Sequence, residues 1–514
     1  MSEVLLGHSY FLRLDLKSWE ARQPYPPLGT LYAAAQLRRR GYDVAVFDAI
    51  LARSEAEWED ALNRARPRFA VLFEDNFNYL SKMCLLRMRD AAFTMLGAAR
   101  ARGCTTIVCG SDATDQAEQY LARGAGFVLL GEGDETLLEL LDRLTGRADT
   151  AVAAIPGIAY RDERRGGVVR TPARPLLREL DALPFPARDL VDVPRYRDVW
   201  QRHHGSFSLN VAASRGCPYH CNWCAKPIWG QRYHVRSPEN VVAELEQVQA
   251  AYGPDHIWFA DDILGVKPGW LARFAELVEE RGGGIPFKCL SRPDLLLRDG
   301  DVDSLRRAGC RTVWMGAESG SQQVLDAMEK GTRVEHILEA TRRLHAAGIE
   351  VGFFLQFGYP GETREDIRRT FRLVRQARPD DIGISVSYPL PGTKFYRAVQ
   401  DELGAKRNWL DSADLAMMFR GPFPTDFYRQ LHTVLHREFR MRRAWRDVAR
   451  TARRPRTLRR RQLTAAGTAL ARAATLPLDH LRLQRLSRLP HESTRLSADR
   501  LRREQAAQPT PQPD

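Results

Sequence analysis

Three cysteines on one short stretch are the residues of this chain best placed to do chemistry. Cys217, Cys221 and Cys224 have the spacing C-x3-C-x2-C, directly after Ser214-Arg215-Gly216. Three thiolates on one loop can bind three irons of a four-iron cluster and leave the fourth iron without a protein ligand. A metal site with an open position can do chemistry, whereas a fourth thiolate would close it. The spacing therefore predicts a [4Fe-4S] cluster that takes a further ligand.

A structural zinc site is the alternative interpretation of the same loop, with His220 as the fourth ligand beside the three cysteines. Zinc would account for the cysteines but not for the residues that follow them. A disulfide is disfavoured, because residues 1–4 contain no basic region leading into an apolar stretch that would mark the chain for export. The remaining cysteines are scattered, and we expect them to be small buried residues: Cys84, Cys104, Cys109, Cys289 and Cys310.

The cysteine loop resembles the signature of the radical S-adenosylmethionine (SAM) enzymes. Besides the spacing, Trp223 matches the aromatic residue that this family usually has before the third cysteine, near the adenine. The resemblance implies that the amino and carboxylate groups of SAM chelate the open iron. It also implies that the reduced cluster splits SAM into methionine and a 5′-deoxyadenosyl radical, with an external one-electron reductant of the flavodoxin or ferredoxin type.

The second half of the chain alternates short apolar runs with helix-length segments. Residues 209–213 lead into the cysteine loop, and the later runs are 256–260, 286–290, 312–315, 351–357 and 382–387. Six such units predict a partial (β/α)6 barrel over residues 207–400. In parallel barrels the chemistry gathers at the carboxyl ends of the strands.

Polar residues stand at the ends of these runs, where the resemblance implies that SAM binds. Acids suit the cationic amine of SAM, and Glu318 lies in a stretch similar to the family's ribose-contacting motif. The predicted SAM-binding set is Trp223, Asp261, Asp262, Glu318, Ser319 and Gln356. For each acid alone the alternative is a helix N-cap or a solvated loop. The order of the set along successive strand ends favours SAM.

The first 150 residues also alternate apolar runs with helical segments, which predicts a doubly wound, Rossmann-like α/β domain with ligands at the carboxyl ends of its strands. This half resembles the cobalamin-binding domain joined to many radical SAM enzymes, through residues 25–29, 109–114 and 130–136. Glycine-rich loops there would let the backbone pass close to a corrin. The predicted cobalamin-binding set is Gly29, Glu74, Asn76, Gly110, Ser111, Gly131 and Glu132.

No histidine occurs from residue 9 to residue 202, so the D-x-H-x-x-G motif that supplies an axial imidazole in some cobalamin proteins is missing. His8 is the only histidine of this half, and no Asp stands two residues before it. We therefore expect cobalamin to bind without histidine ligation.

The basic charge of the chain is concentrated at its C-terminal end. The net charge is +13, and residues 441–514 contain 18 Arg, no Lys and six acids. We therefore expect no nucleic-acid partner, since no aromatic-interleaved RNA-binding module accompanies these arginines. Two interpretations of this segment are weak contact of basic amphipathic helices with an anionic membrane and a solvated appendage. No apolar stretch of eighteen residues exists, and we expect a cytoplasmic enzyme without a membrane span.

The length of the chain, 514 residues, and its changes in composition indicate five parts. We expect a cobalamin-binding domain (1–150), a Pro-rich connector (151–206), the barrel (207–400), a helical extension (401–443) and an Arg-rich, partly disordered tail (444–514).

The resemblance implies a cobalamin-dependent radical SAM enzyme that transfers a methyl group to an unactivated carbon of a small-molecule or lipid substrate. The alternative is an oxidative cyclase or ring-rearranging enzyme of tetrapyrrole or natural-product biosynthesis, such as the anaerobic Mg-protoporphyrin monomethyl ester cyclases. A third interpretation is a cobalamin sensor with an inactive barrel, against which the intact cysteines and strand-end acids argue.

Overall fold

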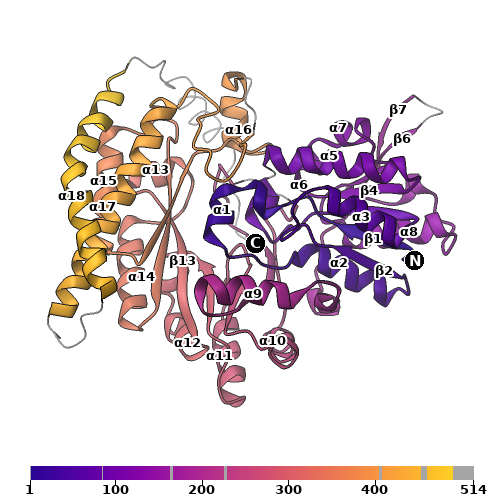
Figure 1. The fold of residues 1–514 in the computed structure, drawn as a ribbon, viewed down its shortest axis with the longest axis horizontal. Helices are drawn as coiled ribbons and strands as arrows, with labels where there is room; N and C mark the ends of the chain where they lie inside the picture. Colours follow the sequence, from indigo (N-terminus) through magenta and orange to yellow (C-terminus); the bar gives the residue numbers. More distant parts are fainter. Residues whose placement is uncertain are drawn as a thin grey trace, which may run out of the picture.

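The computed structural model consists of two mainly parallel sheets with helices on their faces, followed by a pair of long C-terminal helices (Figure 1). It describes residues 2–83, 85–162, 166–224, 228–404, 408–452 and 460–489, with side chains described outside 447–472. The N-terminal domain, in indigo and violet, lies on one side, and the second sheet, in pink, lies beside it.

The first sheet has the strand order β2-β1-β3-β4-β5-β6-β7. Its parallel strands are β1 (Val4–Gly7), β2 (Val44–Phe47), β3 (Phe69–Phe73), β4 (Thr105–Cys109) and β5 (Phe127–Leu129). Alternate strand residues point to opposite faces, so one set packs with α2 (Leu28–Arg39) and α8 (Asp134–Thr145). The other set packs with α3 (Ala56–Ala65), α5 (Leu86–Ala101) and α7 (Ala117–Ala122). The predicted doubly wound fold is confirmed.

Two further strands extend this sheet into the segment expected as a connector. β6 (Ile158–Asp162) and β7 (Gly167–Arg170) add to β5 in antiparallel fashion, so the first domain reaches Arg170. Between these two strands, residues 163–165 lie outside the described residues. The rest of the connector contains α9 (Val193–His204), which begins with Asp192 as N-cap and a proline in its first turn.

The second sheet has six strands in the order β15-β14-β13-β12-β11-β8, and all neighbouring pairs are parallel. The predicted partial barrel is therefore confirmed, and its carboxyl strand ends share one edge. The strands are β8 (Ser208–Val211), β11 (His256–Phe259), β12 (Phe287–Ser291), β13 (Cys310–Glu318), β14 (Glu350–Phe357) and β15 (Asp381–Val386). The helices between them are α10 (Pro238–Tyr252), α11 (Trp270–Glu280), α12 (Asp301–Arg307), α13 (Gln322–Ala327), α14 (Val334–Ala346) and α15 (Arg364–Ala377).

Short elements connect the two sheets and surround their carboxyl edges, and two of them pair next to the cysteine loop. β9 (Ser214–Gly216) pairs in antiparallel fashion with β10 (Tyr233–Val235). The remaining short helices are α1 (Leu16–Ala21), α4 (Tyr79–Met83), α6 (Ser111–Asp115) and α16 (Lys394–Val399).

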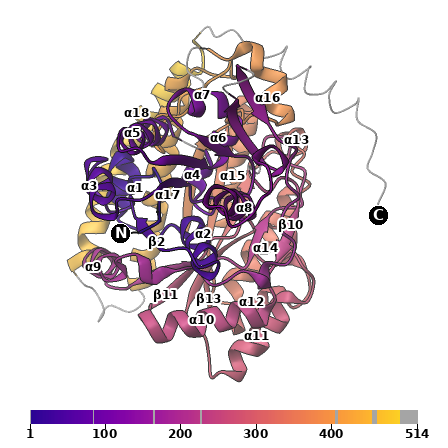
Figure 2. The same ribbon diagram turned by 90° about the vertical axis from the view of Figure 1, so that its right-hand side faces the viewer.

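The C-terminal helices α17 (Thr425–Ala452) and α18 (Arg460–Leu486) pack side by side on the outside of the barrel (Figures 1 and 2). Leu476, Leu483 and Leu486 of α18 pack against the buried core, and Arg437 of α17 pairs with Asp479. The described part of the tail is thus a packed helix, and neither the solvated appendage nor the membrane contact is supported there. Within the described residues, no helix combines the length and apolar character needed to cross a membrane.

Candidate active site between the two domains

The carboxyl edges of the two sheets meet at the contact between the domains. Glu132, just after β5, binds Arg215, which follows β8, and Lys82 of α4, after β3, pairs with Asp262, which follows β11. Asn210 Nδ2 at the end of β8 also donates to the Pro26 carbonyl (2.9 Å). The predicted ligand-binding ends of both sheets therefore form one site.

The cysteine loop leaves β9 at a glycine that no other residue could replace without displacing backbone. Gly216 has φ +81°, and a Cβ there would lie 2.2 Å from the Arg232 carbonyl oxygen. Asn222 then ties the loop to the end of α13, through its amide N–H to Met328 O (3.1 Å) and Nδ2 to Ala327 O (2.8 Å). Tyr359 donates to Asn222 Oδ1 (2.8 Å). We did not predict Asn222 or Tyr359, because their roles depend on contacts across the barrel.

The donor set of this loop fits an iron–sulfur cluster. Cys221 is buried, and Cys217 and Cys224 are half-buried. Among the described residues, no three His, Cys, Asp or Glu side chains are grouped as ligands of a single ion; a cluster needs no such grouping, since each thiolate binds a different iron. The indole N–H of Trp223 is buried without a partner in the described part of the chain, so it is available to a ligand.

The two acids at the end of β11 have different surroundings. Asp261 is 1 % exposed and accepts hydrogen bonds from the Ser214 hydroxyl and from the Ala213 amide (3.2 Å), so it positions the start of the cysteine loop. Burial raises the pKa of Asp261 to about 6, against the effect of these bonds. Asp262 is less enclosed, with a side chain 26 % exposed, and Lys82 Nζ binds its Oδ1. Asp262 thus already holds a primary ammonium group from the other domain.

Glu318 ends β13 in an unusual backbone conformation. Its φ is +55°, in the left-handed region, and the strand register shifts just before it. Its carboxylate accepts a hydrogen bond from Lys330 Nζ (2.8 Å), and both side chains are buried. Gly316 makes room for this pair, because a Cβ there would lie 2.6 Å from each of the two charged groups. The turn therefore places the Glu318 carboxylate at the strand end, where Lys330 provides its counter-charge.

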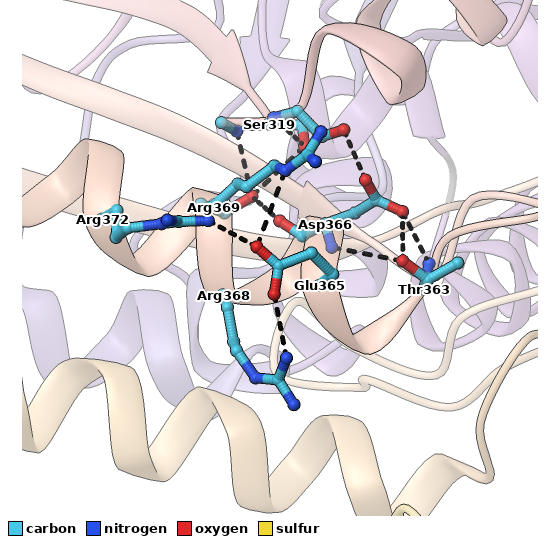
Figure 3. Close-up of polar contacts among 10 residues, drawn as sticks. Ser319, Thr363, Glu365, Asp366, Arg368, Arg369 and Arg372 are labelled. Atoms are coloured by element: carbon cyan, nitrogen blue, oxygen red, sulfur yellow. Dashed lines mark hydrogen bonds and ion pairs between the residues drawn. The ribbon is translucent and has the colours of Figure 1, made fainter.

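Ser319 and Gln356 hold neighbouring loops in place. Ser319 is fully buried, and its hydroxyl contacts Thr370 Oγ1 (3.2 Å) of α15 (Figure 3). Asp366 in the first turn of α15 accepts from Ser321 Oγ and from Thr363, while the neighbouring Glu365 binds Arg368, Arg369 and Arg372 (Figure 3). Gln356 Nε2 donates to Ser387 Oγ (3.1 Å), which joins the ends of β14 and β15.

The residues predicted to bind cobalamin form one continuous arrangement at the edge of the first sheet. Glu74 accepts from the Ser9 hydroxyl (2.7 Å) and amide, and Gly110 has no room for a Cβ, which would lie 2.9 Å from Glu74 Cγ. Ser111 Oγ donates to the Lys82 carbonyl (2.6 Å). These side chains fix the loops against one another.

Other members of this set remain open to a ligand. The amide oxygen of Asn76 is buried without a partner within the described residues. Gly131 has φ +82°, and a Cβ there would meet no atom within 4 Å, whereas the amide of Gly29 is already held by Asp75 Oδ1 (2.9 Å) at the start of α2. An unpaired amide oxygen and accessible backbone are features that a ligand rich in amide groups can use, so the edge fits a corrin.

Arg215 is the main interdomain residue that the sequence analysis missed. Its side chain is 5 % exposed, and Nη1 binds Glu132 Oε1 (2.5 Å) and Asp134 Oδ2 (3.0 Å). Because Arg215 lies two residues before Cys217, this pairing sets the cysteine loop against the cobalamin-type domain. An Arg between Ser and Gly has no local signal for such a role.

Tyr79, at the start of α4, shows that the strand-end residues converge. The pKa of its phenol is raised by desolvation and by the nearby charges of Cys224, Glu318 and Asp262. Tyr79 is nevertheless 57 % exposed as a residue, so it borders open space among groups from both domains. A substrate at this place would lie next to the cysteine loop and to both predicted SAM carboxylates.

The comparisons with known proteins agree with this geometry. Residues 211–374 match the radical SAM superfamily. An uncharacterized methyltransferase of Pyrococcus horikoshii is 28 % identical over 285 residues, which span 55 % of this chain and 60 % of that relative. The hopanoid C-3 methylase of Methylococcus capsulatus is 27 % identical over 436 residues (83 % of this chain, 77 % of the relative). The anaerobic magnesium-protoporphyrin IX monomethyl ester cyclase of Rubrivivax gelatinosus is 24 % identical over 383 residues (74 % and 67 %).

A solved structure extends the similarity to both domains. The cobalamin-dependent SAM radical enzyme OxsB, with aqua-cobalamin and SAM bound, superposes with a TM-score of 0.69 at 16 % identity and covers 98 % of this chain and 78 % of its own. At this identity the likeness establishes the fold. The chain therefore contains a radical SAM domain, within the two-domain fold of the cobalamin-dependent radical SAM enzymes.

Proposed function

We propose that this chain is a cobalamin-dependent radical SAM enzyme that transfers a methyl group to an unactivated carbon of a small molecule. The observation that carries the proposal is the meeting of the cysteine loop with the carboxyl edge of the cobalamin-type domain through Arg215, Glu132 and Asp134. A radical generated at one domain and a methyl donor held by the other have to reach the same substrate atom. The similarity to a methylase over 83 % of the chain supports this reaction.

The bound groups would supply the difficult chemistry. The cluster together with SAM would supply a carbon radical that abstracts hydrogen, and cobalamin would supply a transferable methyl group. Cys217, Cys221 and Cys224 would bind the cluster, Asp262 the SAM ammonium and Glu318 the ribose hydroxyls. Asp261, Ser319 and Gln356 would hold the surrounding loops, since their polar groups are already bound to protein.

The cobalamin-type edge would bind the corrin through Asn76 and Gly131, while Gly29, Glu74, Gly110, Ser111 and Glu132 support the loops that present them. An external one-electron carrier would reduce the cluster.

A cyclase is the second candidate function, because the Rubrivivax cyclase matches 74 % of this chain. Cyclisation and methyl transfer share the cluster, SAM and the corrin-type domain, so the site does not separate them. The products distinguish the two reactions, because cyclisation adds no methyl group.

The test is anaerobic turnover of the reconstituted protein with candidate substrates and SAM labelled with a deuterated methyl group. We expect 5′-deoxyadenosine and a product whose mass increases by one labelled methyl group. A product that loses hydrogen without gaining the label would support the cyclase. A protein that holds one zinc and no iron after anaerobic purification would contradict both, and the triple Ala variant of the three cysteines is the control that should form no 5′-deoxyadenosine.

A further inference from the structure

A buried arginine lies directly against the cysteine loop. Arg292, which follows β12, is 5 % exposed, and its Nη1 donates to Cys221 Sγ (3.8 Å). A sulfur acceptor is large, and this distance is within the range of N–H···S hydrogen bonds. The guanidinium also stacks 3.7 Å from the ring centroid of Tyr219, which lies between the first two cysteines of the loop. The loop is thus in contact with one cation through two of its residues.

The Nε and Nη2 donors of Arg292 are all hydrogen-bonded, so the guanidinium has a single orientation. Nε donates to Asp294 Oδ1 (2.9 Å), and Nη2 donates to the Lys330 carbonyl (2.8 Å) and to Thr332 Oγ1 (3.0 Å). These three bonds fix the planar fork, and they direct one of the two N–H groups of Nη1 to sulfur. An arginine that served only to hold the backbone would not need the fourth contact.

A second cation lies close to the same thiol. Burial alone would lower the pKa of Lys330, but the charges of Glu318 and Cys221 raise it, so the ammonium stays charged. Glu318 offsets the charge of Lys330, and Asp294, whose side chain is 26 % exposed, offsets that of Arg292. Arg292 is therefore the cation that contacts Cys221 directly, and its own counter-charge, Asp294, is partly exposed to solvent.

Charge and hydrogen bonds at a cluster sulfur control how readily the cluster takes up an electron. Reduction adds one negative charge to the iron–sulfur unit, and in a water-poor site a fixed cation stabilises that charge more than it would in solvent. An N–H···S bond also becomes stronger when the sulfur becomes more negative.

We propose that Arg292 is a positioning residue that raises the reduction potential of the cluster by donating to Cys221, with Asp294 setting the size of the effect. The inference depends on the proposed function, since it concerns the cluster bound by the three cysteines. The electron comes from the external one-electron carrier, and no bond to Arg292 forms or breaks. Arginine stays protonated throughout the accessible pH range, so the contribution does not depend on pH.

The test measures the midpoint potential of the anaerobically reconstituted cluster by electron paramagnetic resonance in redox titrations. In Arg292→Gln the potential should fall, so that the ratio of reduced to oxidised cluster at the wild-type midpoint drops about tenfold, a shift of about 59 mV for one electron. In Asp294→Asn it should rise, because the charge of Arg292 is then less offset.

Arg298→Gln is the matched control. Arg298 also binds an acid, Asp301, and two carbonyl groups, those of Gly265 and Val266, but it donates no hydrogen bond to a cysteine of the described residues. Its removal should shift the potential less than either test variant does.

The outcomes separate this inference from the proposed function. Wild-type protein that assembles no cluster would contradict the proposed function and with it the inference. Equal midpoints in wild type and Arg292→Gln, at equal iron and sulfide content, would overturn the inference alone. If Arg292→Gln assembles no cluster, the midpoint potential of Asp294→Asn tests the inference instead. An unchanged or lower midpoint potential in that variant would overturn the role of Arg292.

Discussion

At the scale of single residues, the site contains carboxylates that already have cationic partners. Asp262 holds Lys82 of the other domain, and Glu318 holds Lys330. The sequence indicated acids suited to a SAM ammonium and ribose, and the structure adds that each acid is stabilised by a lysine before any ligand binds. A SAM ammonium at Asp262 therefore has to share the carboxylate with Lys82 or displace it.

Asp262→Asn and Glu318→Gln should each keep the cluster but weaken SAM binding. Loss of a charge-assisted hydrogen bond costs about 1.5–3 kcal/mol, or roughly tenfold to a hundredfold in affinity. SAM titrations of the reconstituted cluster, followed by its spectrum, measure the change. Lys82→Met is the control, since it removes the ion pair but leaves the carboxylate, and it should bind SAM at least as well as wild type. Normal SAM affinity in both acid variants would show that other residues bind SAM.

At the scale of elements, the turn between β14 and α15 encloses an acid. Glu362 is 3 % exposed, and its Oε2 accepts from the Gly358 amide (2.7 Å). Burial, with a contribution from Asp366, raises the pKa of Glu362 from 4.5 to about 8. The carboxyl is therefore mostly protonated in the folded protein near neutral pH, although it would be ionised in the unfolded chain.

This difference gives the folded state an excess of bound protons between about pH 4.5 and about pH 8, so the stability contributed at Glu362 should fall as the pH rises through this range. Glu362→Gln, which mimics the neutral carboxyl, should flatten the pH dependence and raise the melting temperature relative to wild type at about pH 8.5 more than at about pH 6. Glu365→Gln, on the exposed side of α15, is the control and should leave the slope unchanged. Parallel melting curves for wild type and Glu362→Gln would contradict the raised pKa.

At the scale of the whole molecule, charge pairs hold the two domains together across the site. Arg215 and Glu132 are both buried or nearly so, with side chains 5 % and 9 % exposed, and Asp134 completes the pair with help from Gln36 Nε2 (2.8 Å). Since buried ion pairs are costly to break, this contact fixes the relative position of the cysteine loop and the cobalamin-type domain.

Arg215→Met should therefore lower the free energy of unfolding by about 3–5 kcal/mol, because two acids lose their buried partner. Arg38→Met removes an exposed pair with Asp189, whose side chains are 45 % and 58 % exposed, and should cost less than about 1 kcal/mol. Denaturant unfolding of the two variants checks the difference. Similar values would mean that Arg215 does not hold the domains together.

The bound cobalt should have no imidazole ligand. His8 is fully buried, and its Nε2 already contacts Asp48 Oδ1 (3.2 Å) and the Ala49 amide (3.1 Å). Electron paramagnetic resonance of the anaerobic Co(II) form should show no nitrogen superhyperfine lines, and His8→Gln should not change the spectrum. Nitrogen splitting that disappears in His8→Gln would overturn this expectation.

The order of the elements and the expected cluster ligands could both be predicted from the sequence alone. Ligand spacing on one loop is a local property, so Cys217, Cys221 and Cys224 can be recognised as candidate ligands without knowledge of the fold. Apolar runs separated by helix-length segments likewise predicted both sheets, because their strands are buried on both faces.

Which polar residues are already hydrogen-bonded or ion-paired within the protein could be seen in the folded structure alone. Asp261 and Asp262 are neighbours in sequence, yet one is bound to the cysteine loop and the other to Lys82. Arg215, Arg292 and Asn222 have no sequence signal, because each makes a decisive contact with a distant residue. Arg215 and Asp134 are 81 residues apart, Arg292 and Cys221 are 71 apart, and Asn222 and Ala327 are 105 apart. A strand end can be read from local pattern, but the direction of a side chain and the charge opposite it depend on how the two sheets pack.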